Sequence, residues 1–482
     1  MKNFKKISKY FAILMALMSI ISGCRGSNKI IDPPKGACYY VSPAGNDNWS
    51  GTLVSANVGN TDGPFKTLEK AQVAMRLSGI KTTYLRTGTY NRTSTLELTS
   101  ADNGETWSIY PGDAMNSAVF EGNCPGDFID ILGGSKITIN GLTIKYFSTA
   151  IGIHGGPGLP INMPIKFGNS YETATGNTIS NNIIIDGLLK GTNRDRAGII
   201  VEGSAPNTTI SHNVVQNTGF NGIGAWSLIA GDNISGLIIT GNVVLNCMQK
   251  FEDGGAIYTL DRVYSSTNIS ITNNFIRDYG TFGNMGFGIY MDDLSSDQTV
   301  TGNIITGTGS HPFLYHGGKN NTVTGNIVDL GSSGDLPIFH GSAENGKMAN
   351  NKFIGNIIIS SYTTANPRYT PTSRGPWYGT FIDLTNPSLF STAVLVQVQN
   401  NFYHNYSTGG ESTGGGYVYV GNHDYSDSNP VKGDPQISGW TYQIATGSPV
   451  FSSPVNFTPI VGGWGPPGYV IPQTGTPPSC AH

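Results

Sequence analysis

The pattern of polar and apolar residues becomes repetitive at about residue 131. The unit is a polar residue, an asparagine, an apolar residue, any residue and a second apolar residue, as in "NTISNNIII" and "TVTGNIVDL". Successive units lie 23 to 45 residues apart, a spacing that is typical of solenoid proteins. The marker asparagines are Asn140, Asn182, Asn213, Asn242, Asn274, Asn303, Asn326, Asn356 and Asn401.

Each unit contains two or three short runs with alternating apolar positions, and none contains a long amphipathic helix, which excludes helical repeats. Leucine-rich repeats are excluded because the leucine frame is absent. The pattern predicts an all-β fold: a right-handed parallel β-helix, a single-stranded pectate-lyase-like solenoid whose strands stack ~4.8 Å apart. A β-propeller is the alternative. We expect the asparagines to take the left-handed conformation at a bend and to hydrogen-bond along the axis.

The rest of the chain has a different pattern. After a short tether, "TDGPFKTLEKAQVAMR" predicts one amphipathic helix with Thr67 as its N-cap, and "TTYLRTGTY" predicts a strand. Near the end, "GGWGPPGYVIPQTGTPP" predicts a segment that wraps back along the outside. The predicted domains are a signal peptide (1–23), a tether (24–37), an N-terminal cap with the first coils (38–130), the β-helix (131–405) and a C-terminal capping segment (406–482).

The N-terminus has the pattern of an export signal, with four lysines before the apolar run "YFAILMALMSI", which is too short to span a bilayer. "ISGC", ending at Cys24, resembles the cleavage and lipidation motif of bacterial lipoproteins. The resemblance implies acylation of Cys24 and an outer-membrane location on the periplasmic or the outer face. An ordinary secretory signal is the alternative.

Charged residues make up only 12% of the chain, and glycine accounts for 65 of 482 residues. This composition disfavours a helical protein, whose solvent face needs charges, and the recurrent apolar residues disfavour disorder. The net charge of −3 argues against a nucleic-acid partner. The cysteines other than Cys24 have no metal-ligand spacing. We expect a monomer.

A row of aromatic residues is predicted along one face of the coils. The strands "IGAWSL", "AIYTLD", "GIYMDD", "FLYHGG" and "PIFHGS" align at apolar–aromatic pairs. Neighbouring residues of a strand face opposite sides, so Ile257, Ile289, Leu314 and Ile338 are expected to point inward. The outward residues are then Trp226, Tyr258, Tyr290, Tyr315 and Phe339. Aromatic faces pack well against sugar rings; a stack covered by another segment is the alternative.

Carboxylates follow or precede these strands at Asp253, Asp261, Asp292 and Asp293. Glycosidases use two carboxyl groups ~5–9.5 Å apart, one as an acid and one as a nucleophile or base. Neighbouring coils would supply such a pair. The alternatives are that these residues cap turns or that they hold a structural Ca²⁺ ion.

Asp253, Asp261, Asp292 and Asp293 are together called the acidic shelf, and several further side chains are predicted near it. His316, His340 and Lys319 continue it on later coils, and Glu202 and His154 lie at a similar height on earlier ones. Each is a candidate for binding sugar hydroxyls or for tuning an aspartate, and an incidental surface position is the alternative.

The segments "YYVSPAGNDNWSGT", "TDGPFKTLEKAQVAMR", "DGGAIY", "GIYMDD" and the closing "VKGDPQI…TGSPVF…GWGPPGYVIP" resemble secreted β-helix glycoside hydrolases of family 141, which includes fucosidase and xylanase activities. The resemblance implies two catalytic aspartates, which fall on Asp253 and on Asp293 or Asp292. It also implies a polysaccharide or oligosaccharide substrate and no cofactor. This chain is shorter than many relatives, since accessory β-domains and long insertions are missing.

Two other functions remain open at this point. A polysaccharide lyase on the same fold needs a base and a cation against a uronate carboxylate. Arg194, Arg196, Arg262 and Lys319 are available, but no basic cluster faces the acidic shelf in this alignment. A glycan-binding surface lipoprotein without catalysis is the third hypothesis.

Overall fold

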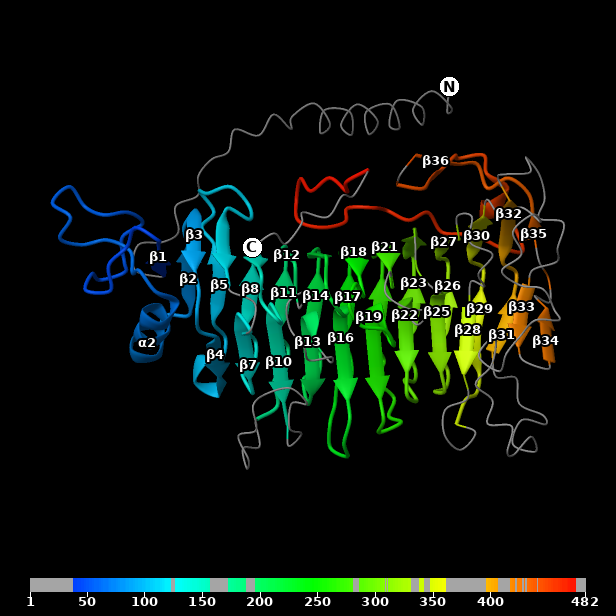
Figure 1. Ribbon diagram of the computed structural model, residues 1–482, viewed down its shortest axis with the longest axis horizontal. Helices are drawn as coiled ribbons and strands as arrows, with labels where there is room; N and C mark the ends of the chain where they lie inside the picture. The colour runs from blue at the N-terminus through cyan, green and yellow to red at the C-terminus, as the bar shows by residue number, and fades with distance from the viewer. Residues whose placement is uncertain are drawn as a thin grey trace, which may run out of the picture.

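The computed structural model describes residues 38–122, 126–156, 172–187, 196–280, 286–307, 309, 311–330, 338–341, 347–360, 396–405, 417–420, 423–426, 429, 431–439 and 441–473. Over these residues the chain is a parallel β-helix, with three parallel sheets running along the long axis (Figure 1). The predicted fold class is confirmed. No helix in these ranges is long and apolar enough to cross a membrane.

Two of the sheets have twelve strands each. The first consists of β1 (Tyr39–Val41), β2 (Thr82–Leu85), β5 (Thr106–Ile109), β8 (Thr138–Asn140), β11 (Thr178–Ser180), β14 (Thr209–Ser211), β17 (Ile238–Thr240), β20 (Ser270–Thr272), β23 (Thr299–Thr301), β26 (Thr322–Thr324), β29 (Asn351–Ile354) and β31 (Val396–Gln399). The second consists of β3 (Gly88–Asn91), β6 (Ala118–Glu121), β9 (Thr143–Lys145), β12 (Ile183–Ile185), β15 (Val214–Gln216), β18 (Val243–Cys247), β21 (Phe275–Tyr279), β24 (Ile304–Thr306), β27 (Ile327–Asp329), β30 (Ile357–Ser360), β32 (Phe402–Asn405) and β35 (Val431–Lys432).

The third sheet, called the nine-stranded sheet below, carries the candidate site. Its strands are β4 (Leu96–Thr99), β7 (Ile129–Leu132), β10 (Ile151–Gly155), β13 (Ala197–Gly203), β16 (Asn221–Ser227), β19 (Gly254–Asp261), β22 (Gly286–Asp292), β25 (His311–His316) and β28 (Ile338–Gly341). Two small antiparallel pairs complete the strands, β33 (Tyr417–Val420) with β34 (His423–Ser426) and β36 (Ile437–Ser438) with β37 (Gln443–Ile444).

Eight buried asparagines form the predicted ladder between the two twelve-stranded sheets. In each step, as at Asn213, the side-chain amide donates to the next asparagine (Asn242 Oδ1, 3.0 Å) and to a carbonyl of the preceding coil. Its own Oδ1 accepts the backbone N–H of Asn182 at 3.0 Å, so the ladder pairs backbone groups that the bend would leave unsatisfied. The members are Asn182, Asn213, Asn242, Asn274, Asn303, Asn326, Asn356 and Asn401.

Two details of the ladder prediction are wrong. The left-handed residue is the one before each ladder asparagine, for example His212 (φ 53°) before Asn213. That residue turns the chain, and the next side chain then points into the buried corner. Asn140 is not a member, because it ends β8 and pairs with Ser180.

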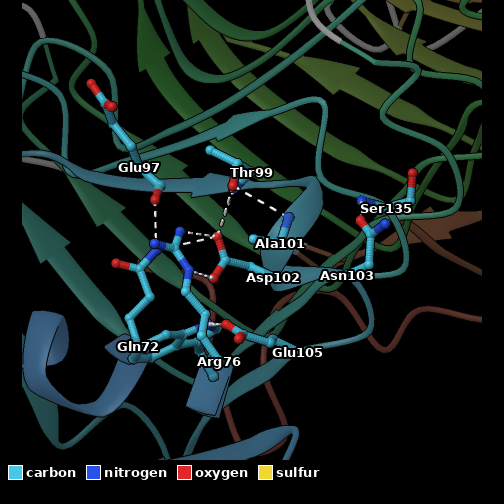
Figure 2. A network of polar contacts seen from close by, with 10 residues as sticks. Gln72, Arg76, Glu97, Thr99, Ala101, Asp102, Asn103, Glu105 and Ser135 are labelled. Atoms are coloured by element: carbon cyan, nitrogen blue, oxygen red, sulfur yellow. Dashed lines mark hydrogen bonds and ion pairs between the residues drawn. The ribbon is translucent and has the colours of Figure 1, made fainter. Parts of the chain in front are cut away.

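A cap closes the N-terminal end of the coil. Helix α2 (Leu68–Ser78) begins after Thr67, the predicted N-cap. From this helix Arg76 makes two 2.6 Å contacts with the buried carboxylate of Asp102, which belongs to the 3₁₀ turn Ser100–Asp102 (Figure 2). A charge-assisted, two-pronged bond therefore joins the cap to the first coil.

The C-terminal segment lies along the outside of the second twelve-stranded sheet (Figure 1). The outer face of that sheet is apolar from Val214 to Phe402, and residues of the segment pack against it. Trp464 contacts Phe275 with ring centroids 5.5 Å apart, and Asn273 donates to the Gly462 carbonyl. The segment, which includes the 3₁₀ turn Pro449–Phe451, thus shields an apolar face from water.

The nine-stranded sheet has the alternation predicted at its centre. Ile257 pairs with Ile289, and Tyr258 pairs with Tyr290. The two isoleucines lie in the interior core, and the two tyrosines belong to a separate apolar cluster on the outer face, together with Trp226.

The prediction for the next strand is wrong by one residue. Phe313 pairs with Ile289, so Leu314 joins the outer cluster and Tyr315 points into the interior core. Phe313, Leu314 and Tyr315 are three large apolar residues in a row. Such a run contains no alternation, and only packing in the interior decides which residues enter it.

Candidate active site

A cavity of about 390 Å³ opens on the outer face of the nine-stranded sheet at β16, β19 and β22. Alternate residues of a strand share a face, which brings Tyr258 and Leu260 of β19 beside Tyr290 and Asp292 of β22. The lining residues are Phe220, Trp226, Leu228, Asp253, Tyr258, Leu260, Arg262, Tyr290, Asp292, Asp293 and His316. All three aspartates proposed as catalytic from the sequence therefore border one space.

Asp292 is the most firmly held of these carboxylates. Its Oδ2 accepts from the Tyr258 hydroxyl at 2.5 Å, and its Oδ1 lies 2.5 Å from His316 Nδ1 and accepts the Asp293 backbone N–H at 2.8 Å. Only 7% of the residue is exposed. The carboxylate is thus oriented before any ligand arrives.

The charges around Asp292 favour its ionised form. Burial alone would raise the pKa of Asp292, but the hydrogen bond and charge of His316, with help from the Tyr258 and Tyr290 hydroxyls, outweigh burial and lower that pKa below its ordinary value. Burial alone would lower the pKa of His316, but Asp292 and the two other aspartates raise it. The pair is therefore a carboxylate beside an imidazolium.

Asp253 faces the same cavity from the start of β19. It has a left-handed backbone (φ 67°), which an aspartate tolerates better than most residues. The Tyr290 hydroxyl donates to Asp253 Oδ1 at 3.5 Å, and Tyr290 also helps to lower the pKa of Asp292. Asp253 and Asp292 therefore share Tyr290 as a neighbour and line the same cavity.

Asp293 contacts a second cation, Arg262, in addition to His316. Its Oδ2 accepts from Arg262 Nε at 2.8 Å, and its Oδ1 lies 3.5 Å from His316 Nδ1. The sequence offered Arg262 as an available cation but predicted no basic cluster facing the acidic shelf. The alternation of the strand could have placed Arg262 at the cavity, because residue 262 continues the outward-facing series of Tyr258 and Leu260.

Aromatic rings form one wall of the cavity. Tyr258 packs edge-to-face against both Trp226 and Tyr290, with centroid distances of 6.1 and 5.0 Å. Leu228 and Leu260 extend the apolar wall, and Asp292 lies directly beside Leu260 in the sheet. A cavity lined by both aromatic rings and carboxylates suits a sugar, whose ring has an apolar face and a hydroxyl rim.

One group in the cavity has the geometry to hold a metal ion. One ligand atom each from Asp292, Asp293 and His316 lies within 4.8 Å of the others. Carboxylate oxygens with an imidazole nitrogen suit several divalent cations. Binding there would compete with the existing contact between His316 and Asp292.

Three residues predicted to bind substrate lie elsewhere. Asp261 caps a turn, because its carboxylate accepts from the backbone and side chain of Ser265 at 2.8 and 3.0 Å. Tyr315 is in the core. The Lys319 ammonium lies 4.3 Å from the centroid of the Tyr264 ring and not on the cavity. The capping role was the stated alternative for the acidic residues.

Glu202 belongs to a second polar group on the same sheet face, which we call the upstream cluster. Its Oε2 lies 2.9 Å from His154 Nδ1, and His154 Nε2 lies 3.6 Å from Asp130 Oδ1. An ion pair between Arg196 and Asp127 lies nearby. The residues Asp253, Asp292, Asp293 and His316 are called the downstream cluster. The side chains of Phe339 and His340, the whole of Arg194 and the lipidation candidate Cys24 lie outside the described residues.

No family model matches the chain, and no curated protein matches it, so the resemblance to glycoside hydrolase family 141 stays a prediction. Among solved structures, the chain is similar to a complex of XylC with xylose (12% identity, 83% of this chain and 87% of that chain, TM-score 0.49). It is also similar to a PL6 alginate lyase in complex with a trisaccharide (14%, 92% and 97%, 0.47). A third is described as a glycoside hydrolase (9%, 67% and 92%, 0.44). The function proposed below rests on the residues of this chain alone.

Proposed function

We propose that this protein is a glycoside hydrolase in which Asp292 and Asp253 are the two catalytic carboxyl groups. The observation that supports it is that both groups line one aromatic-walled cavity, with the Tyr290 hydroxyl 3.5 Å from Asp253 Oδ1. Hydrolysis of a glycosidic bond needs two carboxyl groups about 5–9.5 Å apart, and two carboxyl groups that share one cavity and one tyrosine neighbour support such an arrangement.

The roles follow from the surroundings of each group. Asp292 is kept ionised by His316, which suits the group that attacks the anomeric carbon or takes a proton from water. Asp253 then donates a proton to the leaving oxygen, with Tyr290 positioning it. The ring faces of the aromatic wall hold the apolar face of the sugar.

A lyase is less well supported. It needs a cation that is available to a uronate carboxylate. Among the described residues that line the cavity, the cations are Arg262 and His316, and these already pair with Asp293 and Asp292. Because these lining residues include three carboxylates and two cations that are already paired, the cavity suits an uncharged sugar better than an acidic one.

The test is a screen of neutral and acidic polysaccharides with the purified protein and three variants. Wild type should release reducing ends without ultraviolet-absorbing unsaturated products. Asp292→Asn and Asp253→Asn should abolish the release. Asp297→Asn is the matched control, because Asp297 is outside the cavity and bonds Ser266 and Asn320. Unsaturated products would instead establish a lyase, and affinity without either product would establish a non-catalytic binder.

We also propose that the chain is an outer-membrane lipoprotein, anchored through Cys24, and that it acts as a monomer without a cofactor. The support is the N-terminal sequence and a pair of carboxyl groups sufficient for hydrolysis. Cys24→Ser should move the protein from the membrane to the soluble fraction, light scattering should give one chain, and dialysis against EDTA should leave activity intact. Recovery of a lost activity by Ca²⁺ would instead place a cation at Asp292, Asp293 and His316.

A further inference from the structure

Arg262 holds its carboxylate partner through a single nitrogen of its guanidinium group. Its Nε donates to Asp293 Oδ2 at 2.8 Å. Neither terminal nitrogen, Nη1 or Nη2, makes a hydrogen bond to any of the described residues. The side chain is 58% exposed and lines the cavity. Its terminal N–H donors therefore remain for water or for a ligand in the cavity.

Three arginines of the N-terminal cap pair with carboxylates in a different way. Arg76 gives two nitrogens to Asp102, at 2.6 Å each (Figure 2). Arg86 and Arg92 also each use two nitrogens on one carboxylate. Such a two-pronged bond is the strongest pairing of a guanidinium with a carboxylate. The single bond of Arg262 thus leaves unused the paired N–H edge, the part of the side chain that recognises two neighbouring oxygens.

The charges that line the cavity indicate which pair of oxygens this edge would bind. A carboxylate and two neighbouring sugar hydroxyls both present two oxygens to a guanidinium. The lining residues already include three carboxylates and two cations, and a carboxylate ligand would add a further negative charge close to Asp293. Two hydroxyls add no charge, and each of them can accept from an N–H. The cavity therefore favours an uncharged pair of hydroxyls.

The position of Arg262 indicates which sugar unit carries these hydroxyls. Arg262 directly follows strand β19, whereas Asp253 directly precedes it, and both line the cavity. Asp292 pairs with Leu260, near the end of β19 at which Arg262 lies. Arg262 is thus close to the group proposed to act at the anomeric carbon, and at the opposite end of the strand from the group proposed to protonate the leaving oxygen.

We propose that Arg262 determines substrate specificity, because its unused N–H edge binds two neighbouring hydroxyls of the sugar unit whose anomeric carbon is attacked. This inference rests on the proposed function, and it adds a substrate-binding residue to the two catalytic carboxyl groups. The preferred substrate then has an uncharged unit with two free neighbouring hydroxyls at this position. A unit in which one of them is absent or substituted is bound less tightly.

The first test measures kcat and KM on the polysaccharide found by the screen. Arg262→Met keeps an apolar stem and removes the donors, so it should lower kcat/KM about 10- to 100-fold, the range for hydrogen bonds to a charged group. Most of the loss should be a rise in KM, because the hydroxyls are present before the reaction begins. Arg262→Lys keeps the charge but loses the two-pronged edge, so it should show nearly the same loss.

Arg92→Met is the matched control, because Arg92 also pairs with a carboxylate, that of Glu69, and does not line the cavity. Its kcat and KM should equal those of wild type. Scanning calorimetry should give all three variants a Tm close to that of wild type, since both arginines lie at the surface. Wild-type kinetics in Arg262→Lys would mean that only the charge matters, and would overturn the proposal.

The second test identifies the oxygens that the edge binds. Methyl glycosides of xylose, glucose, mannose and galactose are measured as inhibitors of the hydrolysis, followed by the deoxy analogues of the strongest inhibitor. Removal of either of two neighbouring hydroxyls should raise the inhibition constant of wild type about tenfold and leave that of Arg262→Met almost unchanged. Equal inhibition by intact and deoxy glycosides would overturn the proposal. So would stronger inhibition by methyl glucuronide than by methyl glucoside, which would assign the edge to a carboxylate.

The outcomes separate this inference from the proposed function. Hydrolysis by wild type, with unchanged kinetics in both Arg262 variants, overturns only the role of Arg262 and means that water alone occupies its terminal nitrogens. Absence of hydrolysis of every polysaccharide by wild type overturns the proposed function, and the inference fails with it.

Discussion

The downstream and upstream clusters lie on the same face of one sheet, and of the two it is the downstream cluster that lines the cavity described above. Both place a histidine among carboxylates. In the downstream cluster, the Tyr258 and Tyr290 rings stand beside the carboxylates and enclose open volume. In the upstream cluster, His154, Asp130 and Glu202 are each less than 10% exposed, and none lines the cavity.

The comparison teaches that charge clustering on the face of a solenoid does not define a reaction site. Stacking alone brings polar side chains of successive coils within bonding distance, and many such groups satisfy one another. What distinguishes the downstream cluster is a space in which a ligand meets an ionised carboxylate, a second carboxyl group and ring faces together. We therefore expect the two clusters to respond in opposite ways to the same kind of substitution.

The largest expected effect is on activity. Asp292→Asn should lower kcat by about 10³-fold, because it removes the proposed nucleophile or base. Asp130→Asn, the same change in the upstream cluster, should leave kcat close to wild type and lower the Tm instead. Rates on the polysaccharide found by the screen, together with scanning calorimetry, check both. An equal loss of kcat in the two variants would contradict the distinction between the clusters.

The next effect is on stability. His154→Gln should cost about 3–5 kcal/mol of the free energy of unfolding, because Asp130 and Glu202 would then be buried without their cation. Burial alone would lower the pKa of His154, but hydrogen bonds and charges of the two carboxylates raise it from 6.5 to about 10. Since the folded-state pKa is the higher one, the stabilisation is complete below about pH 6.5 and is lost as the pH rises towards 10.

Urea unfolding at a series of pH values checks this. Wild type should lose stability between about pH 6.5 and pH 10, and the His154→Gln curve should be flatter there. His316→Gln, the matched change in the downstream cluster, should alter activity more than stability, because His316 borders the cavity. The same slope in wild type and the His154 variant would rule out His154 as its source.

A smaller effect is expected at the wall of the cavity. Tyr258→Phe removes the hydroxyl that donates to Asp292 and should lower kcat about 10- to 100-fold, the usual range for a hydrogen bond to a charged group. The loss of a donor should also raise the pKa of Asp292, so the acidic limb of the pH–rate profile should move to higher pH. An unmoved limb would show that another group controls it.

The smallest effect is expected at Lys319. Its ammonium lies over the Tyr264 ring, away from the cavity, and both residues are half-buried, so the contact is worth about 1 kcal/mol. Lys319→Met should leave kcat and KM close to wild type and lower the Tm slightly. A large rise in KM would restore the substrate-binding role that the sequence suggested.

Much of the fold was predictable from local pattern. The asparagine repeat indicated a solenoid, and the 32-residue offset between Tyr258 and Tyr290 correctly predicted that they pair. The pairing failed at Phe313, where three large residues offer no alternation, and Tyr315 was placed on the wrong face for that reason. The same alternation predicts that Arg262 points outward with Tyr258 and Leu260. Its position at the cavity was missed because only the acidic residues were compared between strands.

By itself, the sequence determined the stacked coils, the alternation of core and outer residues, and the concentration of aspartates at the ends of neighbouring strands, because strand periodicity and repeat spacing are local properties. The tertiary structure alone decided which aspartates border a cavity. Side chains at strand ends are directed by turns, such as the left-handed backbones of Asp253 and Asp293, and those turns are set by packing against other coils. Register alone puts Asp261 on the opposite face from Asp292, since Leu260 is the partner of Asp292, but the cavity in front of Asp292 exists only in the folded molecule.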